Sequence, residues 1–170
     1  SMRAGTLLRI EGPLGQFWLR TDSPRAPLMV GGGTGYAPLR AMLRQLIADD
    51  DRRPVVLYWG GRGLPDLYEH GWLESLQRER PGFIYRPVLS DPVAGHDRAW
   101  TGRRGLVHEA VLADHPDLSG FDVYASGPPA MIEAIRSQFA DHGLPRGQLF
   151  FDSFDYAPDT LASLKSAAER

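Results

Sequence analysis

The chain has 170 residues, with 19 Lys and Arg against 21 Asp and Glu, so its formal charge is −2. This length suits one domain with an appendage, and the near-neutral charge argues against nucleic-acid binding, which usually needs a basic face. The absence of Cys excludes disulfides, thiolate metal sites and a cysteine nucleophile on this chain. No apolar run approaches the roughly 18 residues of a membrane span and no signal peptide opens the chain, so we expect a cytoplasmic globular domain without membrane contact. The sequence indicates little about oligomeric state, and we take the chain as a monomer.

The N-terminal region predicts a β-hairpin. Leu7–Ile10 and Phe17–Arg20 are typical of short strands, and a Gly-Pro turn separates them. Two strands alone are marginally stable in water, so we interpret them as the remnant of a larger β-structure, followed by a linker that contains Pro24. We therefore divide the chain into a hairpin with its linker, an α/β domain and a weakly patterned tail, at residues 1–25, 26–157 and 158–170.

From Pro27 onward, apolar runs of strand length alternate with segments of helical period. The predicted strands are 27–30, 54–59, 83–89, 121–125 and 149–151. The predicted helices are 36–47, 64–80, 106–112 and 131–139. This alternation implies right-handed crossovers, so we expect a doubly wound five-stranded parallel sheet of order 3-2-1-4-5 with helices on both faces, preceded by the hairpin.

Two glycine-rich turns follow the first and fourth predicted strands. The first turn is Gly31-Gly32-Gly33-Thr34-Gly35, and the second is Ser126-Gly127-Pro128-Pro129. Glycines let the backbone approach a phosphate closely, and the amides at a following helix start attract anions. Each turn alone is also explained by an ordinary strand-to-helix connection. In the expected strand order, however, both turns line one crevice at the switch point, where open parallel sheets bind ligands.

Polar residues also follow the second and third predicted strands. Arg62 could meet a phosphate or be a solvated surface charge, and Ser90 with Asp91 could receive a ribose or simply begin a polar loop. The first turn lacks the Lys of a P-loop, and no acidic residue ends the second strand as in the usual dinucleotide fingerprint. The five His residues lack metal-ligand spacing, so we expect no metal site and assign them to the surface or the core: His70, His96, His108, His115 and His142.

Five segments, in one order, resemble the ferredoxin–NADP reductase superfamily. They are Gly12-Pro13-x-Gly15-x-Phe17, Gly31-Gly32-Gly33-Thr34-Gly35-x-x-Pro38, Leu57-Tyr58-Trp59-Gly60-Gly61-Arg62, Pro87-Val88-Leu89-Ser90 and Tyr124-x-Ser126-Gly127-Pro128-Pro129-x-Met131. The chain is most similar to the oxygenase reductases and the CDP-6-deoxy-glucoseen reductases of that superfamily. The stretches 100–108 and 151–154 also resemble that group. The resemblance covers nearly the whole chain.

This resemblance implies a two-domain flavoenzyme. A β-barrel holds FAD, the α/β domain binds NAD(P)H, and a hydride passes to the flavin. Electrons then leave singly, often through a [2Fe-2S] domain or protein to an oxygenase. The resemblance implies that Gly32 to Gly35 and Pro38 hold the pyrophosphate and the nicotinamide side of the dinucleotide, and that Gly61 and Arg62 lie near its adenosine half. It also implies that Gly127, Pro128 and Met131 shape the nicotinamide pocket and that Phe154 faces the flavin.

Three departures from the family pattern shape the expectation. The Arg-x-Tyr-Ser/Thr motif that binds FAD is absent, so we expect the flavin half to lie elsewhere and this chain to be inactive alone. Ala125 stands where the resemblance leads us to expect a Cys beside the nicotinamide. Asp91 stands where NADP-specific relatives tend to carry a basic residue. A carboxylate there repels a 2′-phosphate and predicts NADH over NADPH, although Arg62, Arg86 or Arg98 could still hold that phosphate.

Two alternatives remain open. A free-flavin reductase also ends near an aromatic residue such as Phe154. A non-catalytic nucleotide-binding or interaction module is compatible with Ala125 and with the missing barrel.

Overall fold

The computed structural model describes residues 3, 5–7, 9, 15–91 and 100–153. They form one six-stranded, all-parallel sheet of order β4-β3-β2-β1-β5-β6. The strands are β1 Ala26–Gly32, β2 Val55–Gly61, β3 Phe83–Leu89, β4 Arg103–Arg104, β5 Phe121–Gly127 and β6 Leu149–Ser153. The helices are α1 Tyr36–Ala48, α2 His70–Glu79, α3 Val107–Asp114 and α4 Pro129–Gln138, with 3-10 turns at Gly33–Gly35, Leu64–Asp66 and Phe139–His142.

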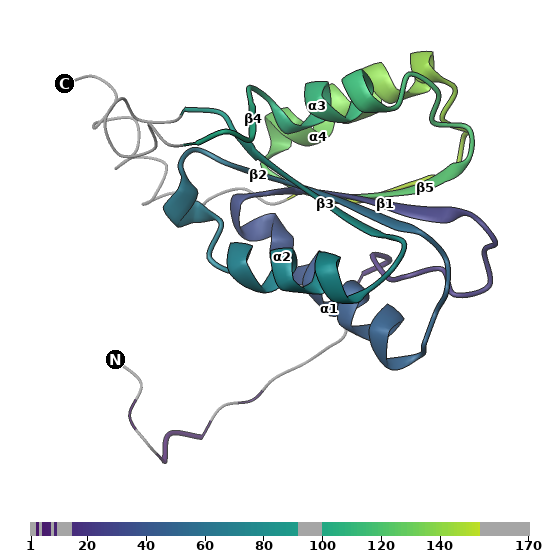
Figure 1. Cartoon of the computed structure of the whole chain (residues 1–170). Coiled ribbons are helices and arrows are strands. Elements are labelled where there is room, and N and C mark those ends of the chain that lie inside the picture. Colours follow the sequence, from purple (N-terminus) through teal and green to yellow (C-terminus); the bar gives the residue numbers. More distant parts are fainter. Residues whose placement is uncertain (1–2, 4, 8, 10–14, 92–99, 154–170) are drawn as a thin grey trace.

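The sheet is covered on both faces, which confirms the doubly wound α/β architecture. Helices α1 and α2 lie on one face, and α3 and α4 lie on the other (Figure 1). The central strands β1, β2 and β5 are apolar and buried almost throughout, as strands covered on both sides must be. Two apolar cores result. One packs beneath α1 around Leu43 and Trp59, and the other packs beneath α3 and α4 around Val111 and Ile135.

The strand count and one helix differ from the sequence prediction. The two-residue strand β4 pairs with Val88 and Leu89 and adds a sixth strand, which is too short to show a pattern of its own; the other five keep the predicted order. The helix predicted over 64–80 is a 3-10 turn followed by α2. The Asp66 carboxylate closes that turn by accepting hydrogen bonds from the amides of Arg62 and Gly63, at 2.8 and 3.0 Å.

The prediction of a second hairpin strand at residues 17–20 is wrong. Residues 17–20 have no regular secondary structure and pair with no strand, and half of the predicted first strand, with most of the turn, lies outside the described residues. Side-chain packing holds this segment instead. Leu19 is buried in the core beneath α1, and the Arg20 guanidinium lies over the rings of Trp18 and Phe150, at 4.3 and 4.5 Å. The apolar pattern therefore reflects contact with the α/β domain.

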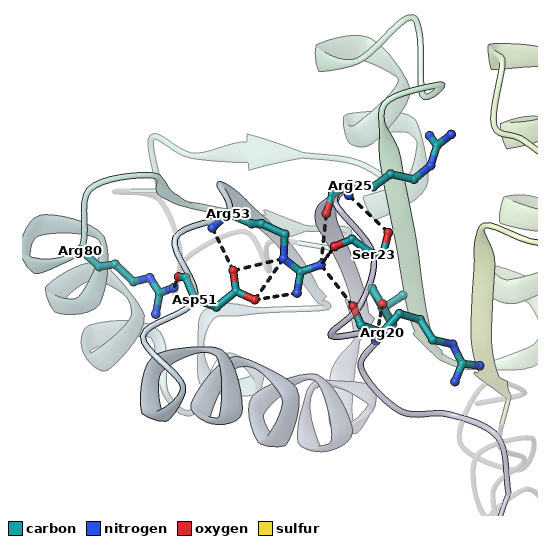
Figure 2. Close-up of polar contacts among 7 residues, drawn as sticks. Arg20, Ser23, Arg25, Asp51, Arg53 and Arg80 are labelled. Atoms are coloured by element: carbon teal, nitrogen blue, oxygen red, sulfur yellow. Dashed lines mark hydrogen bonds and ion pairs between the residues drawn. The ribbon is translucent and has the colours of Figure 1, made fainter.

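Arg53 fixes the segment that leads into β1 (Figure 2). Its Nη1 donates to the backbone carbonyls of Arg20, Ser23 and Arg25, at 3.2, 2.7 and 3.3 Å. Its Nε and Nη2 donate to the Asp51 carboxylate, with the shortest contact at 2.6 Å. The backbone amide of Arg20 also donates to the Tyr124 hydroxyl at 2.9 Å. The predicted linker is thus held to the base of the domain.

Candidate functional site

A crevice of about 620 Å³ opens at the carboxyl ends of β1, β2 and β3. It lies at the topological switch point of the sheet, where the strand order reverses beside β1. Ligands of open parallel sheets bind at this point. The starts of α3 and α4 line it together with the glycine turn that leads into α1. Of the site residues proposed from the sequence, eight line the crevice: Gly32, Gly33, Thr34, Gly61, Arg62, Ser90, Pro128 and Met131.

The two glycine-rich turns touch, as the strand order predicted. A Cβ on Gly35 would collide with the Ser126 carbonyl and would lie 2.9 Å from the Gly127 amide nitrogen. A Cβ on Gly32 would lie 2.8 Å from the Met131 sulfur. These glycines let the start of α1 approach the end of β5, so that the two turns form one wall of the crevice.

Gly33 has the conformational freedom that this turn needs. Its φ of +54° lies in the left-handed region, and nothing would contact a Cβ there within 4 Å. The Trp59 indole donates a hydrogen bond to the Gly33 carbonyl at 2.9 Å. The hydrogen bond from Trp59 of β2 thereby holds the turn, while the Cα side of Gly33 stays open to the crevice.

The other proposed site residues lie behind or beside the crevice. Gly31 packs against Leu39, because a Cβ there would lie 3.1 Å from Leu39 Cδ1, and Pro38 lies in the first turn of α1. Gly127 is covered by Met131. Ser126 is fully buried, and its hydroxyl has no hydrogen-bond partner in the described part of the chain. Phe154 lies outside the described residues.

Ala125 lies in the core of the domain. It is fully buried in β5, pairs with Val30, and belongs to the apolar core beneath α3 and α4. It does not line the crevice, because Ser126 and Gly127 separate it from Pro128. Residue 125 thus belongs to the core and not to the crevice lining, and its place beside the nicotinamide stays a prediction.

Charged groups mark the end of the crevice near β2 and β3. The Arg62 guanidinium lies 3.7 Å from the Asp91 carboxylate, with side chains 78% and 64% exposed. Ser90 Oγ donates to the Gly61 carbonyl at 3.3 Å. Arg86 lies within β3 and is not part of the crevice, and Arg98 lies outside the described residues.

An aromatic cluster supports the same end. Tyr36 stacks on Trp59 with ring centroids 4.0 Å apart, and Tyr68 packs edge-on against both rings. The Tyr36 hydroxyl donates to Glu69 at 2.9 Å, and Arg40 pairs with the same carboxylate at 2.7 Å. Burial, with the neighbouring Glu69, raises the pKa of Tyr36 well above its ordinary value. Tyr68, which lines the crevice, therefore packs on a buried aromatic pair that a hydrogen bond holds in place.

Sequence reasoning missed several crevice residues. They are Pro65, Asp66, Tyr68, Gly105, Leu106, Val107, His108 and Ala130, besides Gly60, which was assigned only to a turn. Most of them belong to the 3-10 turn after β2 and to the start of α3. The signal that was available is positional: every helix that follows a strand of a parallel sheet begins at the ligand-binding edge.

Metal-ligating side chains do not gather in the described residues. Those residues contain no cluster of three or more His, Asp and Glu side chains able to hold a metal ion. Within the same part of the chain, no helix is both long and apolar enough to cross a bilayer.

Comparison with known proteins places the chain in a family. Residues 29–137 match the oxidoreductase NAD-binding domain. The chain belongs to this family. It is 44% identical over 153 residues to CDP-6-deoxy-L-threo-D-glycero-4-hexulose-3-dehydrase reductase from Yersinia pestis, a match that covers 87% of this chain and 43% of that protein. The resemblance drawn from the sequence is thereby confirmed.

Two further relatives of the chain are reductases. An NAD(P)H-flavin reductase from Aliivibrio fischeri is 35% identical over 157 residues, covering 92% of this chain and 64% of that protein. The solved structure of the Amycolatopsis cytochrome P450 reductase GcoB superposes with a TM-score of 0.74 at 36% identity, covering 84% of this chain and 42% of that one. The chain thus spans less than two thirds of the length of these relatives.

Proposed function

We propose that this chain is the NAD(P)H-binding half of a flavin-dependent oxidoreductase. The observation that carries the proposal is the contact between the two glycine-rich turns, which brings the starts of α1 and α4 to one crevice together with the start of α3. Three helix starts at one cavity suit a ligand with two adjacent phosphates. The close approach at Gly32 fits a dinucleotide whose phosphates need contact with the backbone.

Each wall of the crevice has a distinct task in this proposal. The turn Gly31–Gly35 offers amides to the pyrophosphate, and Pro38 holds the first turn of α1 against it. Gly61 and Arg62, with Ser90 and Asp91, receive the adenosine half. Ser126 to Pro128 and Met131 shape the nicotinamide pocket, and Phe154 faces the flavin. When bound, NAD(P)H supplies a hydride and FAD accepts it; this chain binds the donor, orients it and covers one side of it.

The charges at the adenosine end favour NADH over NADPH. Asp91 lies 3.7 Å from Arg62, so the cation best placed for a 2′-phosphate is already paired, and the carboxylate repels a second anion. Both groups are exposed, which limits the preference to a modest factor.

The rest of the reaction belongs to domains beyond these residues. We propose that a preceding FAD domain completes the enzyme, and that electrons pass on to an oxygenase or to an iron–sulfur protein. A free-flavin reductase is the second candidate, and the 35% identity to the Aliivibrio NAD(P)H-flavin reductase favours it. Whether the whole polypeptide retains tightly bound FAD separates the two. A module without catalysis would show no reductase activity even with a flavin domain attached.

The test of the crevice is Gly33→Val. Nothing lies within 4 Å of a Cβ at this position, so the side chain would project into the crevice and displace the pyrophosphate. Gly147→Val is the matched control, because Gly147 also has a positive φ, +88°, and open surroundings, but lies before β6 and away from the crevice. We expect NADH affinity to fall at least tenfold in the first variant only. Equal affinity in both variants would overturn the assignment.

A further inference from the structure

Three polar side chains are buried in the described part of the chain: His108, Asp122 and Ser126. His108 is the one that lines the crevice. Its side chain is 94% covered, since the residue is only 6% exposed, and it has no hydrogen-bond partner among the described residues. The fully enclosed side-chain atoms without a partner in the described residues belong to Asp122 and Ser126 and not to His108. The ring nitrogens of His108 therefore keep an opening to the crevice that the residue lines, where a ligand can complete their hydrogen bonding.

His108 is the second residue of α3, which begins at the crevice. The preceding Leu106 provides no side-chain cap, so the amides of Val107, His108 and Glu109 lack acceptors in the described part of the chain. A Cβ on Gly60 would lie 3.0 Å from Val107 Cβ, which places the helix start directly over the end of β2. The positive end of the helix dipole and the imidazole therefore meet at one place.

The surroundings of His108 favour the neutral form of its ring in the free protein, and a bound anion would favour the protonated form. Burial lowers the pKa of His108, and only Glu109, exposed on the same helix, opposes this shift. The charged groups elsewhere in the crevice are Arg62 and Asp66, and the Asp66 carboxylate is already occupied by two backbone amides. No carboxylate of another element pairs with the ring in the described residues.

We infer that His108 and the start of α3 form a second anchor for the bound dinucleotide, donating hydrogen bonds to a pyrophosphate oxygen that the turn Gly31–Gly35 leaves free. This inference rests on the proposed function. It adds a binding residue from α3, an element that the sequence did not assign to the site. It also makes affinity depend on pH, because a bound anion favours the protonated ring.

The experiment compares His108→Leu and His108→Gln with the unaltered 170-residue chain. Calorimetric titrations use NADH, ADP-ribose and adenosine; the first two contain the pyrophosphate and the third does not. A lost hydrogen bond to a charged group predicts roughly tenfold weaker binding of NADH and ADP-ribose to His108→Leu, with adenosine unchanged. The Gln amide restores most of the affinity, and a thermal melt of each variant reports whether it is folded.

A pH series separates a binding role from a packing role. Between pH 7.5 and 5, NADH affinity of the unaltered chain should rise as the pH falls, because protonation of His108 adds a charge facing the phosphates. His108→Gln should lose this slope. If the unaltered chain binds NADH but both variants bind it equally well with the same slope, this inference fails and the proposed function stands. If the unaltered chain binds neither NADH nor ADP-ribose, both fail.

Discussion

Replacing Arg53 by Ala removes the contacts that hold the segment before β1. The Arg53 and Asp51 side chains are only 13% and 18% exposed, so the carboxylate left behind has little access to water. Removing one partner of a largely buried ion pair costs about 3–5 kcal/mol. Because the three backbone carbonyls released at residues 20–25 can bind water instead, we expect the lower end, about 3 kcal/mol.

The neighbouring residue provides a matched control. Arg52 pairs with Asp50 at 2.5 Å, but those side chains are 84% and 75% exposed, and such pairs contribute little. In thermal unfolding, about 3 kcal/mol corresponds to a Tm roughly 6–12 °C lower for Arg53→Ala. We expect Arg52→Ala to melt close to the unaltered protein. Equal melting temperatures for the two variants would refute the reasoning.

The same ion pair predicts a pH dependence. Hydrogen bonds from Arg53 hold the pKa of Asp51 below its ordinary value in the folded state. Its stabilisation is therefore complete above the unfolded pKa of about 4 and is lost as the pH falls through the lower, folded value. The difference in stability between the unaltered protein and Arg53→Ala should narrow below about pH 4, measured by urea unfolding. A constant difference from pH 7 to pH 3 would contradict this account.

Three further predictions concern the crevice. Gly35→Ala places a methyl group against the backbone at the end of β5, so it should lower the Tm more than any other substitution named here, as a thermal melt would show; an unchanged Tm would mean that the turns are not in contact. Asp91→Asn removes the repulsion and frees Arg62, so the ratio of NADPH to NADH affinity should rise about two- to fivefold in parallel titrations; no change would exclude Asp91 as the selector. Trp59→Phe removes the hydrogen bond to Gly33, so it should lower the free energy of unfolding in urea by about 1 kcal/mol and weaken NADH binding. Unaltered NADH binding would mean that the turn does not need this hydrogen bond.

The strand order was predictable because each strand has a strong local signature. Runs such as Val55–Trp59 are apolar without alternation, and glycines or prolines follow them. The apolar pattern and the turn residues therefore indicate the same strand boundaries. The glycine turns were found for the same reason. Their mutual contact followed from the strand order alone. The structure shows how close it is, because a Cβ on Gly35 would collide with the backbone of β5.

The failures arose where tertiary contact overrides local pattern. Phe17–Arg20 is apolar enough to resemble a strand, but Phe17 packs on Tyr124 and Arg20 lies over the Phe150 ring without a pairing strand. The segment after β2 has helical spacing, but the Asp66 side chain satisfies two backbone amides and closes a turn. His108 lies in the stretch 100–108 that resembles the reductase group, but the sequence did not place it in the crevice, because that place depends on where α3 begins relative to β2.

The central claim is that the crevice binds a nicotinamide dinucleotide. The most direct measurement is calorimetric titration of the unaltered chain with NADH and NADPH in parallel, after the visible spectrum has been checked for bound flavin. The account predicts saturable binding of one dinucleotide per chain, with NADH the tighter ligand. Tighter NADPH would keep the crevice assignment and overturn the selection by Asp91. Binding of neither dinucleotide by the folded chain would contradict the account itself.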